Sequence, residues 1–131
     1  MKNKLDKILA EISAGELIDK ITILEIKKEK IHDEKKLKDV EKELSSLSDT
    51  FKESIIDLSK IKPLIGKLKT INLKLWDIEN GKRLAEKNNN FDEKFIKLAR
   101  DVYKNNDERS KIKLEINDVL GSNIKEIKSH Y

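Results

Sequence analysis

The stretch SAGELIDKITILEIKKEKI, residues 13–31, decides the fold of this chain. With 100° between successive helical residues, Leu17 and Leu24 lie in one apolar stripe, while Ile23 and Ile26 lie on nearly the opposite side. A helix that is apolar on two sides packs against neighbours on both of them. We therefore expect a central helix here, in an all-α protein.

The start of this helix carries a capping signal. Ser13 and Glu16 have the spacing of a capping box, in which the hydroxyl accepts from the amide of residue 16 and the carboxylate reaches back to the amide of residue 13. Residues 1–12 form an N-terminal arm that fits either a short helix or an extended segment. The apolar residues of this arm are Leu5, Ile8, Leu9 and Ile12.

A second helix is predicted after Asp33, a residue type that favours the N-cap position. Its apolar residues follow a three-four spacing without a break: Leu37, Val40, Leu44, Leu47, Phe51, Ile55 and Leu58. This narrow seam is typical of coiled coils, which associate through such seams. The seam therefore predicts a homodimer or another protein partner.

Two more helices are predicted in the second half of the chain. Pro63 fits the first turn of the third helix, and the asparagine run at 88–90 ends it. Asn90 and Glu93 repeat the capping pattern for a fourth helix, which ends just before Gly121.

The remaining residues, 121–131, form a tail that either docks on the helices or stays loose. The connections between the predicted helices are short, and short connections place neighbouring helices antiparallel. We expect a single domain, residues 1–131, built as antiparallel helical hairpins that form a bundle of about four helices with coiled-coil-like packing.

The composition agrees with this fold and excludes several classes of protein. Charged residues make up 41% and hydrophobic residues 37% of the 131 positions, and four glycines and one proline are too few for an all-β fold. Cysteine is absent, which excludes disulfides and thiolate zinc sites and fits a reducing cytoplasm. No apolar run has the length of a membrane span or the pattern of a signal peptide, so we expect a cytoplasmic protein.

The charge pattern argues against one class of partner. The net charge of +4 comes from 29 basic and 25 acidic residues whose signs alternate closely along the chain. Interspersed charges are typical of a solvated helix surface. A nucleic-acid-binding surface needs a basic stripe unbroken by acids, so the pattern disfavours nucleic acid as a partner.

Polar side chains interrupt the apolar stripes of the helices. Asp19 lies among the apolar residues of the central helix. In the third helix, the stripe that contains Leu75 continues into Glu79 and Arg83, whose i, i+4 spacing suits an ion pair. Arg109 interrupts the stripe of the fourth helix. Burial of such groups is costly unless each of them is paired.

Arginine is rare in this chain. It occurs only as Arg83, Arg100 and Arg109, so 26 of the 29 basic residues are lysines. A chain that uses lysine for general positive charge places arginine where a planar, bidentate donor is needed. The partner of these arginines is either an internal carboxylate, such as that of Glu79 or Asp19, or a phosphate or carboxylate of a ligand.

These polar positions define a candidate site with two interpretations. An internal network would set the register of the helices, whereas a pocket between helices would bind an anionic small molecule. We expect no metal and no cofactor, because the one Glu-x-x-His pair, Glu29 and His32, lies at a helix end without a second pair. The candidate residues are Glu16, Asp19, Lys20, Glu79, Arg83, Arg100, Tyr103, Asn106, Asp107, Arg109, Lys113 and Asn117.

Four ordered motifs resemble those of an uncharacterised bacterial family of small helical proteins, a domain of unknown function. They are GELIDKITIL at 15–24, LWDIE at 75–79 with Arg83, FDEKFIKLAR at 91–100 and NDER at 106–109. The resemblance covers residues 13 to 131, although relatives have Glu-Lys-Ser-Tyr where this chain has EIKSHY. It implies no established activity, and it implies a setting near glycosyltransferase and surface-polysaccharide genes.

The expected function is a non-enzymatic interaction or accessory module with an internal polar network. The alternative is an enzyme or binder that acts on a phosphorylated small molecule, such as a sugar nucleotide of surface-polysaccharide synthesis, through a clamp of basic residues. Arg100 and Arg109 point roughly 140–180° apart on a continuous helix, so one pocket cannot easily use both. This divergence weighs against an enzyme.

Overall fold

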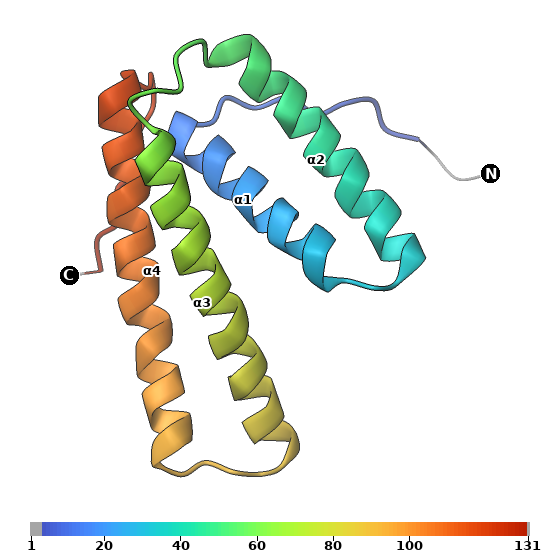
Figure 1. Cartoon of the computed structure of the whole chain (residues 1–131), viewed down its shortest axis with the longest axis vertical. Helices are drawn as coiled ribbons and strands as arrows, with labels where there is room; N and C mark the ends of the chain where they lie inside the picture. The colour runs from blue at the N-terminus through green and yellow to red at the C-terminus, as the bar shows by residue number, and fades with distance from the viewer. Residues whose placement is uncertain (1–3, 131) are drawn as a thin grey trace.

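The structure, a computed structural model, describes residues 4–130. Within this range the chain forms four helices, which are α1 (Ala14–Lys30), α2 (Glu34–Ser54), α3 (Lys62–Lys87) and α4 (Glu93–Leu120). Figure 1 shows that α1 and α2 form one antiparallel hairpin and α3 and α4 a second, longer one, and that the two hairpins splay apart. The prediction of an all-α bundle of antiparallel hairpins is confirmed.

Most predicted helix ends are confirmed by their capping contacts. The Ser13 hydroxyl accepts from the amide of Glu16 at 3.0 Å, and an Asp33 oxygen accepts from the second and third amides of α2. Pro63 lies in the first turn of α3. Gly121 ends α4 with a φ of 64°, a left-handed conformation that glycine adopts without a steric penalty.

Two predicted boundaries are wrong. We expected the second helix to run through Leu58, but α2 ends at Ser54, because the chain then turns to bring Ile61 into the core with no exposed surface. The N-cap of α4 is Asp92 rather than Asn90. The Asn90 amide instead donates to the carbonyl of Ala85 at 2.8 Å and so completes the end of α3.

The core lies at the end of the bundle where α1 meets α3 and α4. A cluster of buried aliphatic side chains fills this junction: Ile18, Ile61, Leu64, Leu68, Ile112 and Ile116. Helix α1 contacts all three other helices, which confirms its predicted central place, whereas α2 contacts α1 alone among the helices. The far half of the α3–α4 hairpin extends beyond α1 as a pair of helices (Figure 1).

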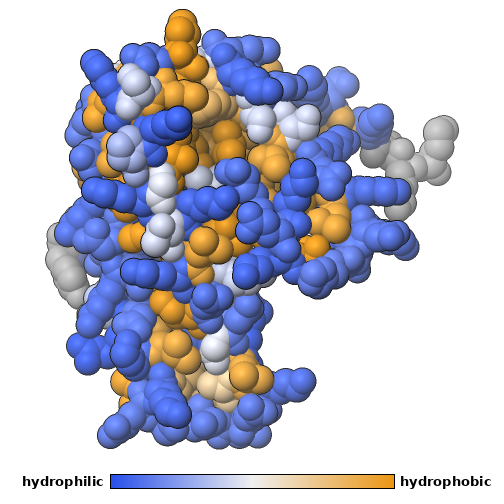
Figure 2. All heavy atoms as spheres, in the orientation of Figure 1, coloured by the Kyte–Doolittle hydropathy of each residue, from blue (hydrophilic) through white to orange (hydrophobic). Residues whose placement is uncertain are grey.

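The seam of α2 is only partly covered. Val40 is its one buried residue, while Leu37, Leu44, Leu47 and Phe51 are half-buried. Helix α2 packs this seam against α1 of the same chain. Figure 2 shows a largely hydrophilic surface that apolar patches interrupt.

The two ends of the described chain differ in their contacts. Residues 4–12 adopt no helix, which decides between our two alternatives for the arm in favour of the extended one. Residues 121–130 dock on the bundle, where they contact the start of α1 and the side of α4. No helix within residues 4–130 combines the length and the apolar character that a membrane span requires.

Candidate functional site

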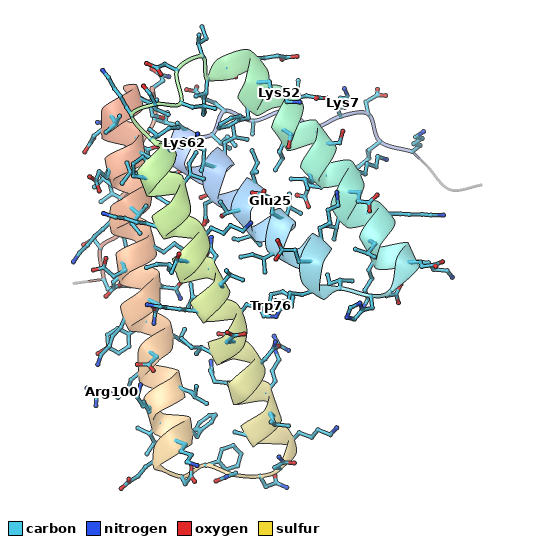
Figure 3. All side chains as sticks on the ribbon, viewed as in Figure 1. Lys7, Glu25, Lys52, Lys62, Trp76 and Arg100 are labelled. Atoms are coloured by element: carbon cyan, nitrogen blue, oxygen red, sulfur yellow. The ribbon has the colours of Figure 1, made fainter. Side chains whose placement is uncertain are left out.

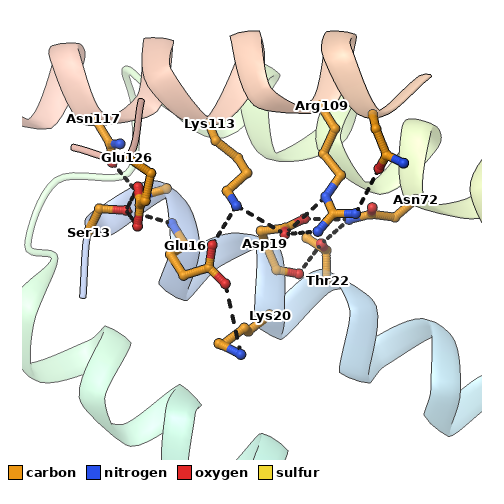
Figure 4. A network of polar contacts seen from close by, with 12 residues as sticks. Ser13, Glu16, Asp19, Lys20, Thr22, Asn72, Arg109, Lys113, Asn117 and Glu126 are labelled. Carbon is orange, nitrogen blue, oxygen red and sulfur yellow. Dashed lines mark hydrogen bonds and ion pairs between the residues drawn. The ribbon is translucent and has the colours of Figure 1, made fainter. Parts of the chain in front are cut away.

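A network of polar side chains joins α1 to α3 and α4 next to the core (Figure 4). Its centre is the carboxylate of Asp19, which is only 1% exposed. One carboxylate oxygen accepts from Asn72 Nδ2 at 2.9 Å. The other accepts from Arg109 Nε at 3.1 Å and from Arg109 Nη2 at 2.8 Å, so two guanidinium nitrogens share one carboxylate oxygen. Hydrogen-bond donors on both oxygens offset the free-energy cost of burying this carboxylate.

The contacts on the α3 side of Asp19 are neutral. Asn72 Nδ2 also donates to Thr22 Oγ1 at 2.9 Å, and the Thr22 hydroxyl donates to the backbone carbonyl of Asp19 at 2.8 Å. Both side chains are buried. Neither was in our candidate set, although Asn72 lies in the same predicted stripe as Leu75, which is the signal that could have identified it.

The α4 side of the network adds a second cation. The Lys113 ammonium hydrogen-bonds Glu16 and lies 3.6 Å from the Asp19 carboxylate. Glu16 also lies 3.8 Å from Lys20. The carboxylate of Glu16 therefore pairs with Lys113 on α4 and does not reach back to Ser13, so this half of the predicted capping box is wrong.

Close approach of α1 and α4 depends on a glycine. A Cβ atom added to Gly15 would lie 2.5 Å from the backbone oxygen of Lys113 and 3.0 Å from the side-chain oxygen of Asn117. The Gly15 amide donates to that Asn117 oxygen at 2.6 Å. Only a residue without a side chain allows this contact at the present distance between the two backbones.

The tail completes the N-terminus of α1. Ser122 Oγ accepts from the Ala14 amide at 3.1 Å. The Ser13 hydroxyl lies 2.8 and 2.7 Å from the two carboxylate oxygens of Glu126, so its one proton is shared between them. A carboxylate near the N-terminus of a helix also interacts favourably with the helix dipole.

These contacts shift the titration of the tail carboxylate. Burial acts to raise the pKa of Glu126, but the Ser13 hydroxyl and a backbone amide lower it. The charge of Lys113 and the amide of Asn117 lower it further, and the resulting pKa is below the ordinary value of 4.5. The carboxylate of Glu126 is therefore better stabilised here than in water.

A groove of about 900 Å³ lies between α4 and the tail. Its basic side chains are Arg109, Lys111, Lys113 and Lys128, and its acidic side chains are Asp107 and Glu126. Lys128 reaches from the tail across the groove to Asp107 at 2.8 Å, and this hydrogen bond lowers the pKa of Asp107. The candidate residues Asn106 and Asn117 also line the groove.

Several candidate residues lie outside this assembly. We expected Glu79 to pair with Arg83, but Glu79 lies 3.6 Å from Lys82, and Arg83 is exposed without an ion pair within residues 4–130. Arg100 and Tyr103 are exposed too, and Arg100 projects from α4 away from α3 (Figure 3). These positions lie beyond the reach of α1, so no third helix covers them.

The network can hold the helices in place relative to one another, because its charged side chains form ion pairs. Asp19 pairs with Arg109 and Lys113, Lys113 also pairs with Glu16, and Asn72 and Thr22 add neutral hydrogen bonds. One donor differs from the rest: Asn117 Nδ2 is buried and has no hydrogen-bond partner within residues 4–130. No group of three or more His, Asp or Glu side chains in that range is arranged to hold a metal ion.

Comparisons with known proteins place the chain in a family. Neither the curated proteins nor the solved structures contain a match to it. A family model, described as a family of unknown function, DUF6165, matches residues 8–131 and so includes every residue of the network and of the tail contacts. The protein belongs to this family of unknown function, as its ordered motifs predicted.

Proposed function

We propose that this protein is a non-enzymatic interaction module, in which the polar network provides a fixed base and the N-terminal arm is the contact element. One observation carries the proposal. In the arm, Leu5, Ile8 and Leu9 are 80%, 83% and 87% exposed. Large apolar side chains gathered in one short segment and left in solvent are typical of a surface that a partner covers.

The spacing within the arm supports folding on contact. Leu5, Ile8, Leu9 and Ile12 stand at positions i, i+3, i+4 and i+7, which is the spacing of one helix face. A segment with this pattern docks as an amphipathic helix in an apolar groove of another protein. Its two lysines are balanced by two acidic residues within residues 4–12, which favours a protein groove over an anionic membrane surface.

The internal pairing of the network supports a role without catalysis. Arg109 binds Asp19 with two nitrogens, and Lys113 binds Glu16. A catalytic cation must be free to meet a substrate charge, whereas these two already have anionic partners inside the fold. A fixed α1 holds the arm at a defined place on the bundle, because the arm leads directly into Ser13.

A second copy of the chain is the partner that we test first. Light scattering across a wide range of protein concentrations should show the wild type rising toward the mass of a dimer. A variant with Leu5→Ser, Ile8→Ser and Leu9→Ser should stay a monomer. Leu84→Ser is the matched control, because Leu84 is 60% exposed but lies on the α3–α4 hairpin. A wild type that is monomeric at every concentration would rule out self-association through the arm.

A second function has one specific observation in its favour. The groove between α4 and the tail carries four basic side chains against two acidic ones. Its size suits a small molecule. A phosphorylated one, such as a sugar nucleotide of surface-polysaccharide synthesis, would have to compete with the carboxylates that now pair with Arg109, Lys113 and Lys128. A thermal-shift screen of the wild type against nucleotide sugars tests this binder, since a ligand that binds only the folded state raises the melting temperature.

A further inference from the structure

The contact between the tail and α1 has the composition of an occupied anion site. The Glu126 carboxylate lies against the Ser13 hydroxyl at the N-terminus of a helix of 17 residues. Lys113 contributes positive charge from α4. Hydroxyl donors, a nearby ammonium group and a helix N-terminus are the features with which proteins bind phosphate and carboxylate groups.

An unused donor at this place points independently to a ligand. Asn117 is only 1% exposed, and its Oδ1 accepts from the Gly15 amide. Its Nδ2 is buried and has no hydrogen-bond partner within residues 4–130, and Asn117 lines the same groove as Glu126. A buried amide donor without a partner is costly, so a better-placed anion oxygen would stabilise it.

We infer that the start of α1, with Ser13 and Asn117, is an anion-binding cradle for the phosphate or carboxylate of a small molecule, and that Glu126 occupies it as a built-in substitute. Departure of the tail would leave three donors for a ligand, two that the tail now engages and one that has no partner. They are the Ser13 hydroxyl, the Asn117 amide and the Ala14 amide, which Ser122 of the same tail now engages. The inference extends the small-molecule binding proposed above as the second function. It rests on that proposal only for the part of the ligand that would fill the groove.

The tail is suited to move because most of its attachments are exposed and polar, apart from the contacts of Glu126 and Ser122 with the start of α1. Residues 123–130 are exposed, and Lys125 and Lys128 hold the tail to α4 through ion pairs with Asp118 and Asp107. Exposed ion pairs contribute little to stability. A ligand that binds only the vacated cradle competes with Glu126, and its apparent affinity falls by the fraction of molecules in which Glu126 is bound.

The test removes the Glu126 carboxylate and adds a free anion that can take its place. Inorganic phosphate and, separately, propionate are titrated into the wild type and Glu126→Ala while NMR follows the amide signals of Ala14 and Gly15 and the side-chain amide of Asn117. We expect saturable shifts in Glu126→Ala, with an affinity at least about tenfold higher than in the wild type. Adding Ser13→Ala should weaken this binding. Glu108→Ala is the matched control, because Glu108 is an exposed acid on α4 that pairs with Lys111.

The alternatives give distinct results. Equal affinity in the wild type and Glu126→Ala, or no saturable shift in a Glu126→Ala protein that circular dichroism shows to be folded, would overturn the cradle. A nucleotide sugar that stabilises the wild type without shifting the NMR signal of the Gly15 amide would support binding in the groove. It would overturn the inference that the site extends into the cradle. Binding of either probe in Glu126→Ala supports the cradle even if no nucleotide sugar binds.

Discussion

The two halves of the α3–α4 hairpin carry similar residues and use them differently. Near the core, Arg109 donates two hydrogen bonds to a fully buried aspartate, whereas in the far half Arg83 extends into solvent. Both arginines continue an apolar stripe of their helix. The difference is the presence of α1, which has 17 residues against 26 for α3 and 28 for α4, and therefore covers only one end of the hairpin.

The largest expected effect tests whether Arg109 contributes more to the stability of the fold than Arg83 does. Arg109→Ala leaves the Asp19 carboxylate buried without its guanidinium partner, and we expect it to lower the free energy of unfolding by about 3 kcal/mol, as for other buried ion pairs that lose one member. Arg83→Ala, the matched change in the far half, should alter it by less than about 0.5 kcal/mol. Urea denaturation measures both. Equal losses in the two variants would remove the distinction between the halves.

An intermediate effect is expected where α1 touches α4. Gly15→Ala places a methyl group against the Lys113 carbonyl, which must move, and should lower the free energy of unfolding by about 2 kcal/mol. Gly66 is the control, because a Cβ atom there has no neighbour within 4 Å. Gly66→Ala in α3 should raise stability by up to about 1 kcal/mol. A Gly15→Ala protein as stable as the wild type would show that the close contact is dispensable.

The smallest expected effect is a loss of stability at acidic pH. Because the folded pKa of Glu126 is lowered, its carboxylate stabilises the fold above the ordinary pKa of 4.5, and this contribution is lost as the pH falls below 4.5 through the folded pKa. The melting temperature of the wild type should therefore exceed that of Glu126→Gln near neutral pH, with the two values converging in acid. A difference that is independent of pH would exclude the charge of Glu126 as its source.

Helix periodicity predicted the elements well because it depends on local sequence. The capping residues Ser13 and Asp33 and the terminal Gly121 act within one turn of the chain, so their roles can be read directly. The errors at Leu58 and Asn90 occurred where a continuing local pattern competed with a turn. The first turn forms because Ile61 is buried in the core, and the second because the Asn90 amide caps the end of α3. Both contacts involve residues outside the local periodic pattern.

The candidate site was predictable only in part, for a related reason. A helical wheel assigns Asp19, Arg109 and Glu79 to inward faces, but it does not show how far a third helix extends along them. Asp19 and Arg109 therefore meet, while Glu79 remains partly solvated beside Lys82. The contact of Ser13 with Glu126 joins distant parts of the chain and follows no spacing rule, so no periodic pattern could have indicated it.

That same contact has a consequence for how the chain matures during synthesis. Ser13 and Glu126 are separated by 113 positions, so α1 cannot receive its tail cap until Glu126 has left the ribosome. Closing so long a loop is entropically expensive and is deferred until other contacts have formed. Nascent chains arrested before residue 122 should therefore present an uncapped α1 to chaperones and proteases, and the last step of folding would secure the first element made.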